Sequence, residues 1–306
     1  MLHQFSLVSH WSKRTAMAMI RGIIFFSYMF TITIVLGAVL WPFLFGGVRG
    51  ARVSAKIWCH ALLFGLRWLT GIRTNIEGRE NIPQGAALIA ANHQSMWETL
   101  FLFHLLPAPV FVLKQELIQV PIIGSWLRST GAIEIDRSAG IRAIRKLNDD
   151  AAERIRQGAQ VVIFPEGTRR PVGSETSLQP GVAAIYKSAG APCTPAAHDS
   201  GRHWIHPGPA KSSGVITIRF LPAIPTGLDK RSFLSKLDIA ITNARPDLSH
   251  STSKQAAGKQ AAGKPAANAQ SAPIQAQGTR GNAITSTDTT HERVAQAPET
   301  KMGTTS

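Results

Sequence analysis

Short apolar runs alternate with helical patterns across residues 86–243, and this alternation constrains the fold more than any other feature of the chain. The strand candidates are residues 86–91, 109–113, 132–135, 160–164, 191–197 and 215–221, and the helix candidates are residues 95–106, 139–157, 180–189 and 231–243. The second helix is the clearest, because its apolar residues share one face and Gly158 follows its end. We therefore predict an α/β fold with a sheet flanked by helices.

A histidine and a carboxylate stand five positions apart, directly after the first strand candidate. On one continuous helix, His93 and Glu98 would point about 140° apart, since each residue turns about 100°. They can meet if His93 lies on the loop and Glu98 lies in the first helical turn. The Ser95-x-x-Glu98 pattern favours this placement, because it is the capping box that begins a helix. The same pattern leaves an alternative open, in which Glu98 only caps the helix and His93 is an ordinary loop histidine.

A second loop of interest follows the strand candidate at residues 160–164 and spans residues 165–170. In this loop Gly167 lets the backbone approach a ligand closely, and Arg169 offers a planar fork that suits a phosphate. Taken alone, the loop is better interpreted as a plain turn with surface arginines. Two loops that follow strands in one α/β region, one with a base and one with an anion receptor, favour an active site.

These segments resemble the motifs of the glycerolipid acyltransferases, and most closely those of the bacterial 1-acyl-sn-glycerol-3-phosphate acyltransferases. The resemblance covers roughly residues 76–243, and residues 92–98, 131–137, 164–169 and 191–196 carry it in the family's order. The first of these segments is similar to the family's His-x4-Asp block, and the third matches the family residue for residue. The chain departs from the pattern at Glu98, where the family usually has aspartate. Its carboxylate must therefore approach His93 from slightly farther back.

The resemblance implies a sheet flanked by helices, as in these acyltransferases, and transfer of a fatty acyl group from a thioester to a lipid hydroxyl. The donor would be acyl-CoA or acyl-carrier protein. The acceptor would be the sn-2 hydroxyl of lysophosphatidate, and the product would be phosphatidic acid. His93 would act as the general base, which is worth about 10²–10⁴ in rate, and Glu98 would orient its ring. No cofactor and no metal is implied.

The resemblance also assigns residues to the acceptor phosphate. Gly167, Thr168 and Arg169 would receive it, with Glu166 holding the loop or binding the acceptor. Arg137 and Lys114 are further phosphate candidates. For these two residues, a solvated charge at the end of a strand is an equally good interpretation.

Two other functions stay open. One is acyl transfer to a different acceptor, such as a lyso-ornithine lipid, glycerol-3-phosphate or another lysophospholipid. The other is a non-catalytic protein that binds membrane surfaces.

A catalytic nucleophile is not apparent, because the chain lacks Gly-x-Ser-x-Gly and neither Cys59 nor Cys193 lies in a reactive motif. The adjacent residues His198, Asp199 and Ser200 cannot converge as a catalytic triad does.

The main apolar run covers residues 22–45 and would form a helix about 36 Å long, enough to cross a hydrocarbon core of about 30 Å. A signal peptide is the competing interpretation, but the run is long for one and no small-x-small site follows cleanly. Basic residues flank both ends, so the helix could also dip in and return on one side. Residues 57–69 fit an interfacial or hairpin helix, with a buried helix of the catalytic region as the alternative.

Charge and composition complete the expected organisation. The formal net charge of +15 fits an anionic lipid surface, and without a nucleic-acid motif nucleic acid is the weaker interpretation. We expect membrane-anchoring helices in residues 1–70, an acyltransferase domain in residues 71–248 and a disordered low-complexity tail in residues 249–306. The expected partners are the phospholipid bilayer, lysophosphatidate and the acyl donor. The expected location is a bacterial inner membrane, with the catalytic domain on the cytoplasmic face.

Overall fold

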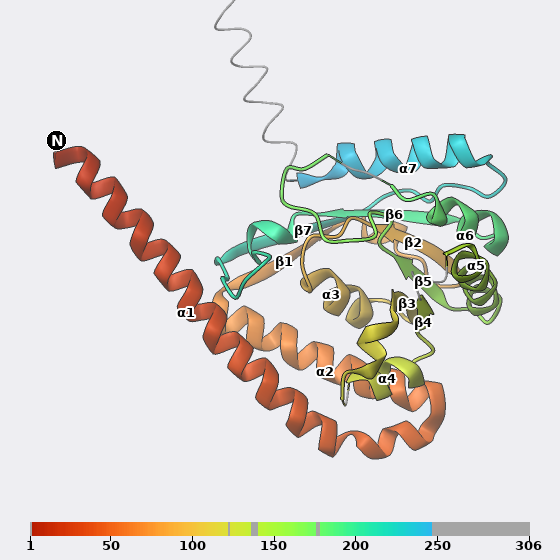
Figure 1. Ribbon diagram of the computed structural model, residues 1–306, viewed down its shortest axis with the longest axis horizontal. Coiled ribbons are helices and arrows are strands. Elements are labelled where there is room, and N and C mark those ends of the chain that lie inside the picture. Colours follow the sequence, from red (N-terminus) through yellow and green to blue (C-terminus); the bar gives the residue numbers. More distant parts are fainter. Residues whose placement is uncertain (1, 122, 136–139, 176–177, 247–306) are drawn as a thin grey trace, which may run out of the picture. The chain divides into compact units, whose positions relative to one another are not determined.

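The computed structural model describes residues 2–121, 123–135, 140–175 and 178–246 (Figure 1). Seven strands form one sheet in the order β1-β7-β6-β2-β5-β3-β4, and every neighbouring pair is parallel except β6 and β7. The strands are β1 (Ile72–Glu77), β2 (Ala87–Ala91), β3 (Pro109–Lys114), β4 (Ile133–Ile135), β5 (Gln160–Ile163), β6 (Cys193–His198) and β7 (Gly214–Phe220). The helices are α1 (Leu2–Val39), α2 (Gly47–Thr70), α3 (Trp97–Leu105), α4 (Ile123–Ser129), α5 (Gly140–Arg156), α6 (Gly181–Ala189) and α7 (Lys230–Ala244).

The predicted α/β fold is confirmed, and every predicted strand and helix of residues 86–243 is present with ends that differ by at most two residues. Strand β1 was missed. It lies at the edge of the sheet, where β7 is its one partner among the described strands, so most of its side chains are exposed or half-buried. A strand with so few buried side chains lacks the apolar run that reveals the others.

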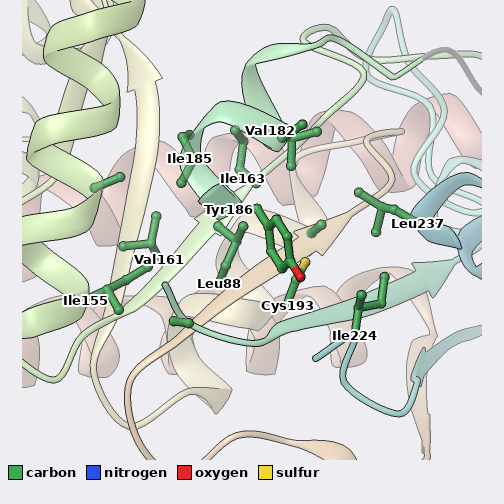
Figure 2. Close-up of a cluster of buried hydrophobic side chains, with 14 of the residues drawn as sticks. Leu88, Ile155, Val161, Ile163, Val182, Ile185, Tyr186, Cys193, Ile224 and Leu237 are labelled. Carbon is green, nitrogen blue, oxygen red and sulfur yellow. The ribbon is translucent and has the colours of Figure 1, made fainter. Parts of the chain in front are cut away.

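Two apolar clusters cover the two faces of the sheet. Because side chains alternate along a strand, Leu88 and Ala90 of β2 enter one cluster, whereas Ile89 and Ala91 enter the other. Helices α5, α6 and α7 pack on the first cluster, part of which Figure 2 shows around Leu88 and Tyr186. Helices α2 and α3 pack on the second cluster. Every residue of β2 is buried, so the central strand holds the loop that follows it in a fixed place.

The apolar amino-terminal run ends its helix earlier than predicted. Helix α1 continues only to Val39, and residues Trp41–Gly46 form a 3-10 helix, η1. The cause is Pro42, which has no N–H to donate and whose ring clashes with the preceding turn. The part of α1 that is long and apolar enough to cross a membrane is Thr15–Val39, with 25 residues, or about 38 Å at 1.5 Å per residue. Helix α2 then runs back beside α1, and Tyr28 Oη donates to the carbonyl of Ala61 at 2.9 Å.

Helix α1 also contacts the segment that follows β6. A Cβ added at Gly22 would lie 1.8 Å from the carbonyl oxygen of Pro209, so only glycine allows this approach. The backbone N–H of Lys211 donates to the carbonyl of Ala18 at 2.9 Å. The fully buried Lys211 ammonium lies 4.5 Å from the ring centroids of both Phe26 and Trp204.

The division of the chain at residues 70 and 248 stays a prediction, and the predicted tail at 249–306 lies outside the described residues.

Helix α2 carries two different apolar faces, which accommodates both interpretations of residues 57–69. Leu62 and Leu66 are buried against the sheet, whereas Phe64 and Trp68 are exposed.

The Leu66→Ala substitution is expected to lower the free energy of unfolding by about 2–5 kcal/mol, because it leaves a cavity in the core. The Phe64→Ala control should change it by about 0.5 kcal/mol or less. Denaturant unfolding of both variants in detergent tests this, and equal effects would contradict the assignment of the buried face.

Candidate active site

The site lies where three neighbouring strands end. Strands β5, β2 and β6 are parallel neighbours, with Ala90 level with Ile163 and Ala91 level with Ala196. Their carboxyl ends therefore meet at one edge of the sheet, where α/β proteins place their ligands. The loop with His93 follows β2, the loop of residues 164–170 follows β5, and Ser200 comes two residues after β6. Each segment is fixed by a buried strand behind it.

His93 and Glu98 form a hydrogen-bonded pair, the dyad. His93 Nδ1 lies 2.8 Å from Glu98 Oε1, with His93 on the loop and Glu98 in the first turn of α3. Because a carboxylate only accepts hydrogen bonds, Nδ1 carries the proton and Nε2 is left with its lone pair. The imidazole stacks on Phe164, with ring centroids 4.1 Å apart and planes at 10°. The ring is thus held from its edge and from its face.

Glu98 both caps the helix and orients His93, so the two interpretations of the motif hold together. Its Oε1 also accepts from the backbone N–H groups of Gln94 and Ser95, at 2.8 and 2.7 Å. Its Oε2 lies 2.7 Å from Ser95 Oγ and 2.8 Å from Ser200 Oγ, and either hydroxyl can donate to it. The side chain is fully buried. Its extra methylene, relative to aspartate, is accommodated within this set of donors.

The charge of Glu98 is fixed by its surroundings. Burial alone would raise the pKa of Glu98, but the charges that His198 and His93 carry when protonated and the hydrogen bonds from His93 and Ser95 hold it well below its usual range. Burial lowers the pKa of His198. His198 Nε2 lies 2.7 Å from the carbonyl of Asn92, and its Nδ1 accepts from Ser200 N–H at 3.3 Å. His198 is therefore a neutral support of the two loops.

The loop after β5 is joined directly to the His93 loop. Gly167 has a φ of 71°, a left-handed conformation that favours glycine. The N–H of Arg170 donates to the carbonyl of His93 at 2.8 Å. Glu166 Oε2 accepts from the N–H of His93 at 3.4 Å. Of the two roles foreseen for Glu166, holding the loop is the one that these contacts fit.

The structure shows fewer contacts for the other residues that were predicted to bind the acceptor. Arg169 is half-buried, and its Nε has no hydrogen-bond partner among the described residues. Thr168 is exposed. Lys114 is exposed at the end of β3, beside β5, so it lies on the same edge of the sheet. Arg137 lies outside the described residues.

Sequence reasoning missed Asn92, His198 and Ser200. Asn92 joins the ends of β2 and β6, because its amide pairs with both backbone groups of His198 at 3.0 and 2.9 Å. His198 and Ser200 are not a catalytic triad, as expected, yet both contact the dyad loop. Their position at or just after the carboxyl end of a strand is the signal that could have revealed them.

Glu166 gives the site a pH-dependent contribution to stability. Burial raises the pKa of Glu166 to about 7, against the His93 hydrogen bond and the charges of Arg245 and Arg170. A raised pKa in the folded state stabilises the protein below the ordinary value of 4.5, and this contribution is lost as the pH rises through about 7. We expect Glu166→Gln to gain melting temperature relative to the unmodified chain as the pH rises across this window. Thermal unfolding of both proteins measures this difference, and parallel curves would contradict it.

Comparison with known proteins agrees with this geometry. The family described as Acyltransferase matches residues 73–199. The 1-acyl-sn-glycerol-3-phosphate acyltransferase of Pseudomonas aeruginosa is 39% identical over 173 residues, which cover 56% of this chain and 67% of that protein. The human 1-acyl-sn-glycerol-3-phosphate acyltransferase alpha is 29% identical over 182 residues, 58% of this chain and 64% of its own. The crystal structure of the 1-acyl-sn-glycerophosphate acyltransferase PlsC from Thermotoga maritima has the same fold, with a TM-score of 0.60 at 19% identity, over 74% of this chain and 99% of that one.

The α/β sheet and the family match define the class of protein as an O-acyltransferase. The chain belongs to the 1-acyl-sn-glycerol-3-phosphate acyltransferase family. The matched region spans about two thirds of the length of these relatives.

Proposed function

We propose that the chain transfers a fatty acyl group from acyl-CoA or acyl-carrier protein to the sn-2 hydroxyl of lysophosphatidate, which yields phosphatidic acid. The names of the relatives support this acceptor. The observation that carries the proposal is the dyad, with His93 Nδ1 at 2.8 Å from Glu98 and its loop joined to the loop that bears Arg169. No cofactor is required, because the thioester donor is itself a substrate.

In this mechanism His93 Nε2 takes the proton of the acceptor hydroxyl while the hydroxyl oxygen attacks the thioester carbonyl carbon. Glu98 stabilises the imidazolium that forms, because it is ionised and accepts from Nδ1. The carbon–sulfur bond then breaks, and the imidazolium returns its proton to the leaving thiolate. Overall, the ester C–O bond and the thiol S–H bond form, while the thioester C–S bond and the acceptor O–H bond break. Base catalysis of this kind contributes about 10²–10⁴ in rate.

Arg169 is the residue that we propose for the acceptor phosphate, together with Gly167 and Thr168. A guanidinium presents a planar set of donors that matches phosphate oxygens. Its Nε is buried and lacks a hydrogen-bond partner among the described residues. Lys114 and Arg137 remain further candidates.

We also propose that α1, η1 and α2 attach the chain to a membrane. Large apolar side chains are exposed along all three, including Phe30 and Val39 of α1, Phe45 of η1 and Trp68 of α2. A monomeric soluble protein rarely exposes so large an apolar surface. The net charge of +15 adds attraction to anionic lipids. The finer proposal is a bacterial inner membrane, with the catalytic domain on the cytoplasmic face.

A panel of acceptors with one radiolabelled acyl-CoA tests the substrate. The purified chain should acylate lysophosphatidate with a higher kcat/KM than glycerol-3-phosphate, a lyso-ornithine lipid or another lysophospholipid. A higher value for one of those acceptors would keep the chemistry and overturn the acceptor. Release of thiol from acyl-CoA separates both results from a non-catalytic membrane-binding protein, which would bind liposomes without consuming thioester.

A further inference from the structure

A cavity of about 380 Å³ borders the dyad loop, and part of its wall is formed by residues that belong to neither the His93 motif nor the Arg169 motif. Its lining includes Gln94, Arg170, Gly201, Arg202 and His206. Gln94 and Arg170 belong to the loops after β2 and β5, whereas the other three belong to the segment after β6. The cavity therefore opens where the ends of three adjacent strands meet.

Sequence adjacency and hydrogen bonds connect the walls of the cavity to His93. Gln94 follows His93 in sequence, and Arg170 N–H donates to the His93 carbonyl at 2.8 Å. Gly201 N–H donates to Gln94 Oε1 at 3.1 Å. A Cβ added at Gly201 would lie 2.7 Å from Val172 Cγ2, so glycine allows the two sides to close together. A ligand in this cavity is held at a fixed place relative to His93.

The charges that line the cavity are positive. Two guanidinium groups and one imidazole contribute to its wall, and no carboxylate is among its lining residues. The Nε of Arg170 is buried and lacks a hydrogen-bond partner among the described residues. Burial lowers the pKa of His206, and the nearby charges of Arg169 and His93 lower it further. The nearby carboxylates, Glu98 and Glu166, are engaged with the His93 loop.

We propose that this cavity is a subsite for the acceptor's phosphate monoester, with Arg202 and His206 as specificity-determining residues that complement Arg169. The inference rests on the proposed function. In lysophosphatidate, only two carbons separate the oxygen of the free hydroxyl from the phosphoester oxygen. Gln94 lines the cavity and directly follows His93, so we place the phosphate in this cavity when the hydroxyl is at His93 Nε2. The phosphate groups of CoA or of a carrier protein lie at the other end of the long pantetheine arm, too far from the thioester to occupy it.

Arg202→Gln tests the proposal, with KM for lysophosphatidate and KM for acyl-CoA measured separately, each with the other substrate saturating. We expect KM for lysophosphatidate to rise about tenfold or more, since a hydrogen bond to a charged group is lost, while kcat and KM for acyl-CoA change little. Arg202→Lys should recover part of the loss. Inorganic phosphate should compete with lysophosphatidate in the unmodified chain and compete less in Arg202→Gln. Arg73→Gln, which removes an exposed arginine on β1, is the matched control.

Because Arg202 is half-buried, the exposed His206 provides a second variant, His206→Gln, whose fold is checked by thermal unfolding. It should raise the same KM in the same direction. An unchanged KM for lysophosphatidate in both variants would overturn the proposal. A rise confined to KM for acyl-CoA would also overturn it and would assign the cavity to the donor. Failure of the proposed function is distinguishable, because it would appear in the unmodified chain as no acylation of lysophosphatidate.

Discussion

Replacing His93 by glutamine is expected to lower kcat by about 10²–10⁴, because the acceptor hydroxyl then loses its base. Glutamine retains a polar side chain of similar length, so the loop keeps its backbone hydrogen bonds to Glu166 and Arg170. The unfolding transition and liposome binding should match those of the unmodified chain. Initial rates of thiol release from acyl-CoA, with lysophosphatidate present, measure the effect.

His60→Gln is the matched control for this experiment, since His60 is an exposed histidine on α2. It should retain full activity. A folded His93→Gln protein with more than about a tenth of the original kcat would remove His93 from the mechanism, since general bases contribute at least about 10².

The second large effect is expected when Glu98 is replaced by alanine, which should lower both the activity and the stability of the protein. Glu98→Ala leaves His93 Nδ1 and the backbone N–H groups of Gln94 and Ser95 without their acceptor. Removing one partner from a buried set of this kind costs about 3–5 kcal/mol of folding free energy. It should also lower kcat, because the imidazole loses the contact that fixes its tautomer. Denaturant unfolding and kcat, measured on the same preparation, test both parts.

Ser200→Ala gives a graded comparison within the same set of contacts. It removes one donor to Glu98 Oε2 and leaves Ser95 Oγ at 2.7 Å, so it should cost only about 1 kcal/mol. Glu116→Ala, which removes an exposed carboxylate after β3, should have no effect. If Glu98→Ala were as stable as Glu116→Ala, the buried donors would have found other acceptors and the role assigned to Glu98 would be wrong.

The placement of the dyad could be predicted from the sequence because it depends on local geometry. Helix rotation and the capping pattern put His93 on the loop and Glu98 in the first turn, which the structure confirms. The supporting contacts could not be predicted in the same way. Ser200 is 102 residues from Glu98, and the two meet only because β6 is inserted next to β2 in the sheet. Strand order of that kind follows from the packing of the whole domain.

Elements at the margins of the fold were also harder to predict. Strand β1 has few buried side chains, so its sequence resembles a loop. The composition of residues 22–45 predicts one long helix, but Pro42 divides the run after Val39. The catalytic roles of the site residues and the boundaries at 70 and 248 stay predictions.

The contact between Gly22 and Pro209 has a consequence for how substrate arrives. At that level of α1 the two backbones touch, so no lipid chain can pass between the helix and the segment that carries His206. If α1 is the membrane anchor proposed above, lipid surrounds only its remaining sides at this level. A lysolipid that moves from the bilayer to His93 would therefore have to pass on another side of α1.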